Sequence, residues 1–332
     1  MVESFASSNG ILLTSQLRTV RADERKLRQA AARGELVQVH RGAYVRTDAW
    51  SALDHREQYR RRVIAAALAS RSHPVLSHQS AAAVWGIPIV GGDPSVVHVL
   101  TSATAGTRTE NGFRRHAATA GSDDIVERDG VRVTSLARTL IDLARLVTFP
   151  AAVAAIDWSL RPPTKGALPR TDIAALQEYF DGQLATHHRR RVHRALEFAS
   201  SLAESPGESV SRATIHELGF PAPVLQCRVE DARGLAGITD FAWPQHGLLG
   251  EFDGLVKYTR NMARAGENVE EIVVREKVRE DRLRATGRRV ARWLWSEAMQ
   301  PALLHDKLVA AGLPPSKSGP LRQIRAGAPA RI

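Results

Sequence analysis

The sequence of 332 residues contains a single cysteine, Cys227, and no long apolar run. One cysteine excludes intramolecular disulfides and zinc sites built from cysteines, so we expect Cys227 to be a small core residue. No apolar segment approaches the roughly 18–20 residues that a bilayer-spanning helix needs. The first residues lack the basic start and the cleavage site of a signal peptide. We therefore expect a cytoplasmic protein with no membrane partner.

Acidic residues are scarce relative to basic ones. The chain has 46 Lys and Arg against 35 Asp and Glu, a formal net charge of +11. The excess is concentrated in residues 1–120, which hold 16 basic against 9 acidic residues. Such a surplus favours a polyanionic partner such as nucleic acid. Walker loops, dinucleotide fingerprints and internal repeats are absent, and the length allows two or three domains.

The segment 237–258, GITDFAWPQHGLLGEFDGLVKY, predicts two short strands joined by a turn. Side chains two apart on a strand share a face, so Glu251 and Asp253 project the same way, with Asp240 at the mouth of that face. Three acids in one place repel one another unless a cation joins them. Oxygen-rich clusters suit Mg²⁺ or Mn²⁺, so Asp240, Glu251 and Asp253 are candidate metal ligands. The alternative is a solvated hairpin with scattered acids.

The flanking segments add further candidates. Glu208 falls in the first turn of a predicted helix, where it either completes the ligand shell or is an acid favoured by the helix macrodipole. Lys257 and Lys277 are candidate water-activating cations, or residues of an exposed surface. The pattern of apolar residues and turns predicts this order: a helix at 204–219, two strands and then a third ending near 254, a helix at 269–285, and a strand at 288–295.

These elements carry a resemblance to a known superfamily. The matching segments are Glu208, G-F-P-x-P-x-x-Q (219–226), T-D-F-A-W-P (239–244), E-F-D-G (251–254), E-K-x-R-E-D-x-L-x-x-x-G (276–287) and R-V-x-R-W (289–293). They resemble the PD-(D/E)XK restriction-endonuclease-like superfamily, and within it the domain of very-short-patch-repair endonucleases. The resemblance implies a three-layer α/β/α domain and a Mg²⁺-dependent nuclease with Asp240 and Glu251 on the metal. Asp253 stands where the superfamily commonly has lysine, and the histidine frequent in close relatives is missing.

The N-terminal segment predicts a small winged helix over residues 10–47. Two helices are followed by a hairpin that turns at His40-Arg41-Gly42. A basic helix with a basic β-wing suits the major groove and the flanking phosphates of DNA, although basic residues also line the wet face of any small helical domain. The candidate nucleic-acid-binding residues are Arg21, Arg25, Lys26, Arg28 and Arg41.

Residues 8–160 resemble the AbiEi family, the antitoxin half of type IV toxin–antitoxin systems. The motifs are L-S-H-Q-S-A-A-A-V-W-G-I-P (76–88) and V-R-V-T-S-L-A-R-T-L-I-D-L-A-R (131–145). This resemblance implies a repressor and a nucleotidyltransferase-type toxin as partner. Within the motifs, His78 is expected to cap a helix or lie in the core rather than to be catalytic. Arg138 and Asp142, four apart, are expected to form an intrahelical pair.

The sequence as a whole predicts an α/β (α+β) protein with five parts. They are a winged-helix domain (1–50), a mixed α/β middle region (51–160), a helical linker (161–200), an endonuclease-like domain (201–312) and a disordered tail (313–332). Two functions remain open. One is a DNA-binding Mg²⁺-dependent endonuclease acting in phage defence or DNA processing, with Glu208, Asp240, Glu251, Asp253 and Lys257 as catalytic residues. The other is a non-catalytic antitoxin-like transcriptional repressor.

Overall fold

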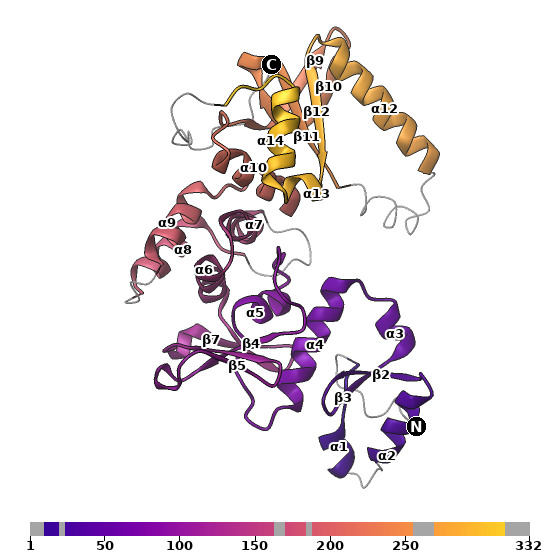
Figure 1. Ribbon diagram of the computed structural model, residues 1–332, viewed down its shortest axis with the longest axis vertical. Coiled ribbons are helices and arrows are strands. Elements are labelled where there is room, and N and C mark those ends of the chain that lie inside the picture. Colours follow the sequence, from indigo (N-terminus) through magenta and orange to yellow (C-terminus); the bar gives the residue numbers. More distant parts are fainter. Residues whose placement is uncertain (1–9, 20–23, 163–169, 184–187, 255–268, 316–332) are drawn as a thin grey trace. The chain divides into compact units, whose positions relative to one another are not determined.

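A computed structural model describes residues 10–19, 24–162, 170–183, 188–254 and 269–315 (Figure 1). Helices and sheets are mixed throughout, which confirms the α/β fold class. The chain divides into two compact units. The first comprises Met1–Val147 with Gly166–Val192, and the second comprises Thr148–Lys165 with His193–Ile332. Among the described residues, no helix is long and apolar enough to cross a membrane.

The first unit begins with two helices and a hairpin, as the sequence predicted. Its elements are β1 (Leu12–Leu13), α1 (Thr14–Thr19), α2 (Glu24–Ala32), β2 (Leu36–His40) and β3 (Ala43–Arg46). The strands form a sheet of order β1-β3-β2, and Gly42 makes the hairpin turn at a φ of 80° that glycine tolerates best. Leu27 and Ala30 of α2 are buried in one cluster with Leu12, Leu36 and Tyr44, so the sheet supports the inner face of this helix.

The rest of the first unit contains two further sheets surrounded by helices. A sheet of order β4-β6-β5 lies beside the antiparallel pair β7-β8. The strands are β4 (Val97–Thr101), β5 (Arg108–Glu110), β6 (Phe113–Ala117), β7 (Ile125–Arg128) and β8 (Val131–Thr134). The helices are α3 (Thr47–Ser51), α4 (His55–Ala69), α5 (His78–Trp85), α6 (Leu136–Leu146) and α8 (Ile173–Asp181), with α9 (Arg189–Phe198) crossing the boundary of the units and short 3₁₀ turns at Ala103–Ala105 and Ser122–Asp124.

The predicted pair on α6 is present and buried. Arg138 Nε donates to Asp142 Oδ2 over 2.7 Å, and both side chains are 4% exposed. Asp124 contacts Arg138 at 3.1 Å, and Arg145 contacts Asp142 at 3.2 Å, so each buried charge has more than one partner. Removing one member of such a network leaves an uncompensated charge in the core.

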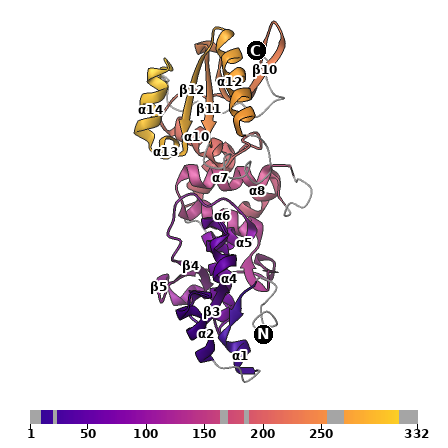
Figure 2. The ribbon, with the colours of Figure 1, turned by 90° about the vertical axis from the view of Figure 1, so that its right-hand side faces the viewer.

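The second unit follows the predicted order of elements. Its strands form one sheet of order β12-β11-β10-β9, in which only the β11–β12 pair is parallel (Figures 1 and 2). The strands are β9 (Val224–Asp231), β10 (Gly234–Trp243), β11 (Leu248–Asp253) and β12 (Arg289–Leu294). The helices are α7 (Phe149–Leu160), α10 (Pro206–Glu217), α12 (Val269–Ala285), α13 (Trp295–Ala298) and α14 (Pro301–Ala310), with a 3₁₀ turn at Pro244–His246.

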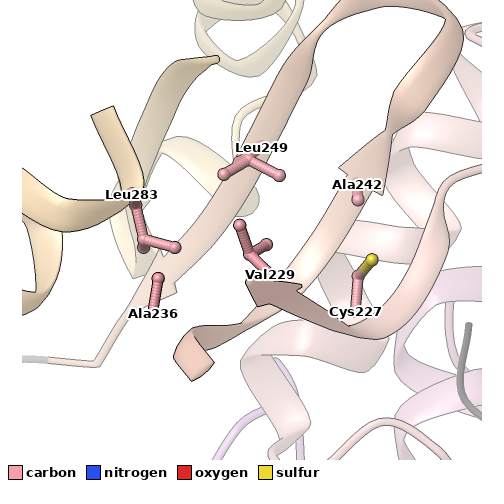
Figure 3. Packing of buried hydrophobic residues seen from close by; sticks show 6 residues of the cluster. All are labelled: Cys227, Val229, Ala236, Ala242, Leu249 and Leu283. Carbon is pink, nitrogen blue, oxygen red and sulfur yellow. The ribbon is translucent and has the colours of Figure 1, made fainter. Parts of the chain in front are cut away.

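Both faces of this sheet are covered. On one face, the Leu283 side chain of α12 closes a buried cluster with Cys227, Val229, Ala236, Ala242 and Leu249 (Figure 3). Cys227 is therefore a core residue, as predicted. On the other face, Trp293 of β12 donates its indole N–H to Ser211 of α10. A Cβ at Gly250 would lie 2.7 Å from the Trp293 ring, so only glycine allows this packing.

The unit boundary differs from the predicted domain limits. The α7 helix, expected at the end of the middle region, packs against α10 in the second unit. A buried ion pair joins them: Arg212 Nη2 lies 2.8 Å from Asp157 Oδ2, and the two side chains are 1% and 0% exposed. Segment 166–192 clusters instead with the first unit, so the expected linker 161–200 is divided between the two. Of the expected tail, residues 316–332 lie outside the described residues.

Candidate functional site

The N-terminus of α10 positions Glu208. Ser205 caps the helix by accepting a hydrogen bond from the Glu208 amide at 3.2 Å, and Pro206 occupies the first turn. The Glu208 carboxylate is folded inward, with the residue only 7% exposed. Its Oε2 accepts hydrogen bonds from the Glu204 amide at 2.8 Å and the Gln226 side chain at 3.0 Å. This acid is held in place by more than the helix macrodipole.

The β10–β11 pairing brings Asp240 and Glu251 together. Phe241 pairs with Gly250 across the two antiparallel strands, so one step further along places Asp240 opposite Glu251. Directly opposite residues share a face of the sheet. Asp240 Oδ2 accepts a hydrogen bond of 2.8 Å from the Phe252 amide, which fixes its carboxylate at the edge of the pairing.

Electrostatics link the three carboxylates. Burial and the negative charges of Glu208 and Glu251 raise the pKa of Asp240 to about 7, against the opposing effects of the Phe252 amide and Arg279. Burial also raises the pKa of Glu208. Asp240 and Glu251 therefore lie opposite each other on adjacent strands, and Glu208 of α10 is near enough for its charge to act on Asp240.

Two arginines contact Glu251, and sequence reasoning did not single them out. Arg279 Nη2 of α12 lies 2.7 Å from Glu251 Oε1, and Arg292 Nη2 of β12 lies 2.7 Å from Oε2. Arg292 Nε also donates to Oε2 at 2.8 Å, and its Nη1 contacts Glu280 at 3.0 Å. Because β11 and β12 are parallel with Glu251 paired to Arg292, the backbone register itself sets this contact. The only sequence signal was the R-V-x-R-W segment.

The structure describes two of the three remaining candidate residues, Asp253 and Lys277. Asp253 ends β11 half-buried, paired with Leu294, and strand alternation places it on the face of Glu251. Lys257 lies outside the described residues. Lys277 is described and is exposed on α12. Among the described residues, Arg279 and Arg292 are cations that contact Glu251.

The carboxylate oxygens of Asp240 and Glu251 are the type of ligand that a hard divalent ion prefers. Among the described residues, none donates a hydrogen bond to the buried Glu251 Oε1, although Arg279 Nη2 lies 2.7 Å from it as an ion pair. The raised pKa of Asp240 indicates negative charge that the surroundings do not fully compensate. Carboxylate oxygens are the ligands that Mg²⁺ and Mn²⁺ prefer. Within the described part of the chain, however, no three His, Cys, Asp or Glu side chains are arranged to hold a metal ion.

The predicted nucleic-acid-binding residues of α2 face outward. Arg25, Lys26 and Arg28 are exposed, on the side of the helix away from its buried Leu27. Arg41 is exposed at the turn of the β2–β3 hairpin, and Arg21 lies outside the described residues. The helix that packs on this small sheet and the tip of the sheet's hairpin therefore both carry exposed cations.

His78 lies in the core, in agreement with the structural role expected for it. The residue begins α5 at a φ of 47°, is 9% exposed, and stacks its ring on that of His116 with centroids 3.7 Å apart. His98 Nδ1 and His116 Nε2 lie 2.9 Å apart. Three histidines from α5, β4 and β6 therefore form one buried cluster, which the sequence did not reveal because its members are far apart along the chain.

Comparison with known proteins gives relatives but no family. No protein-family model matches the chain. Two proteins from Mycobacterium tuberculosis, of strains CDC 1551 and H37Rv, are each 28% identical to it over 130 residues, and both are described only as uncharacterized. The match covers 38% of this chain, which spans 44% of the length of each relative.

Proposed function

We propose that this protein binds DNA through its first unit and hydrolyses phosphodiester bonds in its second unit with the help of Mg²⁺ or Mn²⁺. The observation that carries the proposal is that Asp240 lies opposite Glu251 and within electrostatic reach of Glu208, with its pKa raised to about 7. Carboxylates that repel one another in a buried place are what a divalent ion relieves. The endonuclease-like order of elements around these residues supports the same interpretation.

Each residue has a role in this proposal. Asp240 and Glu251 would hold the ion from adjacent strands, with Asp253 as a further ligand from the same face. Glu208, fixed by its hydrogen bonds to Glu204 and Gln226, would orient water beside the ion. When bound, the ion supplies Lewis acidity toward phosphate oxygens and lowers the pKa of water.

The arginines take the place of the missing motif lysine. Arg279 and Arg292 are 29% and 27% exposed, so solvent and a bound strand reach them. A guanidinium matches the geometry of a phosphate oxygen pair and stabilises the charge that develops there during cleavage. In the first unit, α2 enters the major groove with Arg25, Lys26 and Arg28 while Arg41 contacts a flanking phosphate.

The test is nicking of a supercoiled plasmid by the full chain with and without Mg²⁺ or Mn²⁺. We expect metal-dependent nicking that Asp240→Asn abolishes, because the substitution removes a charged ligand while keeping the shape. Asp306→Asn is the matched control, since Asp306 is an 80% exposed acid of the same unit. Absence of nicking on plasmid, single-stranded DNA and RNA with either metal would refute the hydrolase.

A second function is favoured by one observation. Glu251 is already neutralised by Arg279 and Arg292, and Asp253 stands in the usual lysine position. In this alternative the second unit is a non-catalytic scaffold, and the protein is an antitoxin-like repressor whose partner is a nucleotidyltransferase-type toxin. Binding to the promoter of its own gene without any cleavage, together with co-purification of such a toxin, would favour the repressor.

A further inference from the structure

Two β-hairpins of the first unit meet at their tips. The β2–β3 hairpin turns at Arg41 and Gly42, and the β5–β6 hairpin turns at Asn111 and Gly112, which have φ values of 51° and 78°. Positive φ at both central residues is typical of a tight hairpin turn. The ring of His40 packs edge-on against that of Phe113, with centroids 5.7 Å apart. The second hairpin therefore continues the surface of the first.

Like charges lie opposite each other on the β5–β6 hairpin. Arg108 pairs with Arg115 across the antiparallel strands, so their side chains share one face. Directly opposed cations destabilise a strand pair. Glu110 offers only weak compensation, because its Oε2 is 3.6 Å from Arg108 Nε and both side chains are 56% exposed.

The Arg115 guanidinium contacts an aromatic ring, and one of its nitrogens has no hydrogen-bond partner among the described residues. Its carbon lies 5.8 Å from the centroid of the Phe113 ring, which orients the group. Within the described part of the chain, Arg115 Nε is buried with no hydrogen-bond partner. An oriented cation that faces a second cation across a strand pair is an arrangement that an anion stabilises.

We propose that Arg108 and Arg115 form a clasp for one backbone phosphate of duplex DNA. Opposed residues of an antiparallel pair have Cβ atoms about 5 Å apart, so both guanidiniums reach a single phosphate. The adjoining tip carries the exposed Arg41, so the two hairpins contact neighbouring stretches of backbone. This inference rests on the DNA binding proposed for the first unit and adds a second contact element to it.

The experiment measures binding of the full chain to a fluorescent duplex of random sequence between 50 and 300 mM salt. The clasp variant is Arg108→Gln with Arg115→Gln. The matched control is Arg71→Gln with Arg190→Gln, which removes the same charge from exposed positions of the same unit. We expect the slope of log affinity against log salt to become shallower by about 0.9 in the clasp variant, as for one lost phosphate contact. Affinity should fall roughly tenfold, and the control should match the wild type.

A second readout separates a binding role from a structural one. Because the opposed cations repel each other, the clasp variant should melt at the same temperature as the wild type or higher without ligand. Inorganic phosphate should raise the melting temperature of the wild type and not that of the variant. A lower melting temperature of the free variant would show that the arginines serve folding, and would overturn the proposal.

The remaining outcomes distinguish this inference from the proposed function. If Arg25→Gln with Lys26→Gln weakens DNA binding while the clasp variant equals its control, the clasp is wrong and DNA binding by α2 stands. If phosphate protects the wild type but the DNA slope does not change in the clasp variant, the site takes a small anion and not DNA. If the wild type does not bind duplex DNA at 50 mM salt, both proposals fail.

Discussion

The buried histidine cluster of the first unit should make that unit sensitive to mild acid. Burial lowers the pKa of His116 to about 4, and burial together with the charge of His116 lowers the pKa of His98 to about 3 and that of His78 well below its usual value. The charged groups that act on the cluster are mainly cationic: Arg114 opposes protonation of all three, and Arg138 that of His78. Asp93 acts in the opposite direction and raises the pKa of His98.

The sign follows from which state binds protons. In the unfolded chain each histidine titrates near 6.5, so below that pH the unfolded state binds more protons than the folded state. The stability that the neutral cluster contributes is fully present above pH 6.5. It is lost as the pH falls from 6.5 toward the folded values of about 4 and 3 for His116 and His98. At pH 5 this linkage amounts to about 2 kcal/mol for each of these two histidines.

The measurement is hydrogen exchange of β4 and β6 peptides in the full chain, corrected for the intrinsic rate at each pH. Between pH 6.5 and 5 we expect the free energy of opening to fall by about 1 kcal/mol per pH unit for each of His98 and His116. His116→Gln should remove the contribution of one histidine from this pH dependence. It should also lower the free energy of opening by about 1 kcal/mol at pH 7.5, because the contact with His98 is altered. His55→Gln, an exposed control, should leave it unchanged. A free energy of opening that does not vary with pH in the wild type would refute the reasoning.

Three further predictions concern the second unit. Arg279→Gln removes a cation that competes for Glu251, so the dissociation constant for Mn²⁺, measured by electron paramagnetic resonance of the free ion, should fall roughly tenfold; an unchanged or weaker affinity would contradict the competition. Leu283→Ala leaves a cavity under α12 and should cost about 2–5 kcal/mol in urea unfolding, and a loss below 1 kcal/mol would show that α12 is loosely seated. Asp157→Ala leaves the buried Arg212 charge without its partner carboxylate and should lower the free energy of unfolding by about 3–5 kcal/mol. Asp157→Asn should lower it less, because the amide oxygen still accepts a hydrogen bond. Equal losses for the two variants would argue against an uncompensated charge.

The order of elements in the second unit could be predicted because its signals are local. A 3.6-residue apolar period indicated the helix at 269–285, and the structure has α12 at Val269–Ala285. Ser205 and Pro206 marked the start of α10, and turn residues separated the strands. The hairpin placed Asp240 and Glu251 on one face, since strand alternation and antiparallel pairing follow from the sequence of the two strands alone.

The cations of the site could not be predicted in the same way. Arg292 reaches Glu251 only because β12 joins β11 in parallel after the α12 crossover, and the sequence does not specify that register. Arg279 reaches the same carboxylate because α12 covers that face of the sheet, which is a packing outcome. Proximity in sequence suggested Lys257, which lies outside the described residues. The same limit applied to α7, whose place in the second unit depends on the buried pair between Asp157 and Arg212.

The net charge of the candidate site affects how strongly it can bind a divalent ion. Three carboxylates and two arginines sum to one negative charge when all are ionised, and a pKa of about 7 leaves Asp240 half protonated at neutral pH. In the proposed function, a divalent ion would displace a proton from Asp240 and repel Arg279, unless an anion draws the arginine away. A phosphodiester strand is such an anion, because it pairs with guanidinium groups directly. Strand and ion should accordingly bind with positive coupling, each lowering the electrostatic cost of the other.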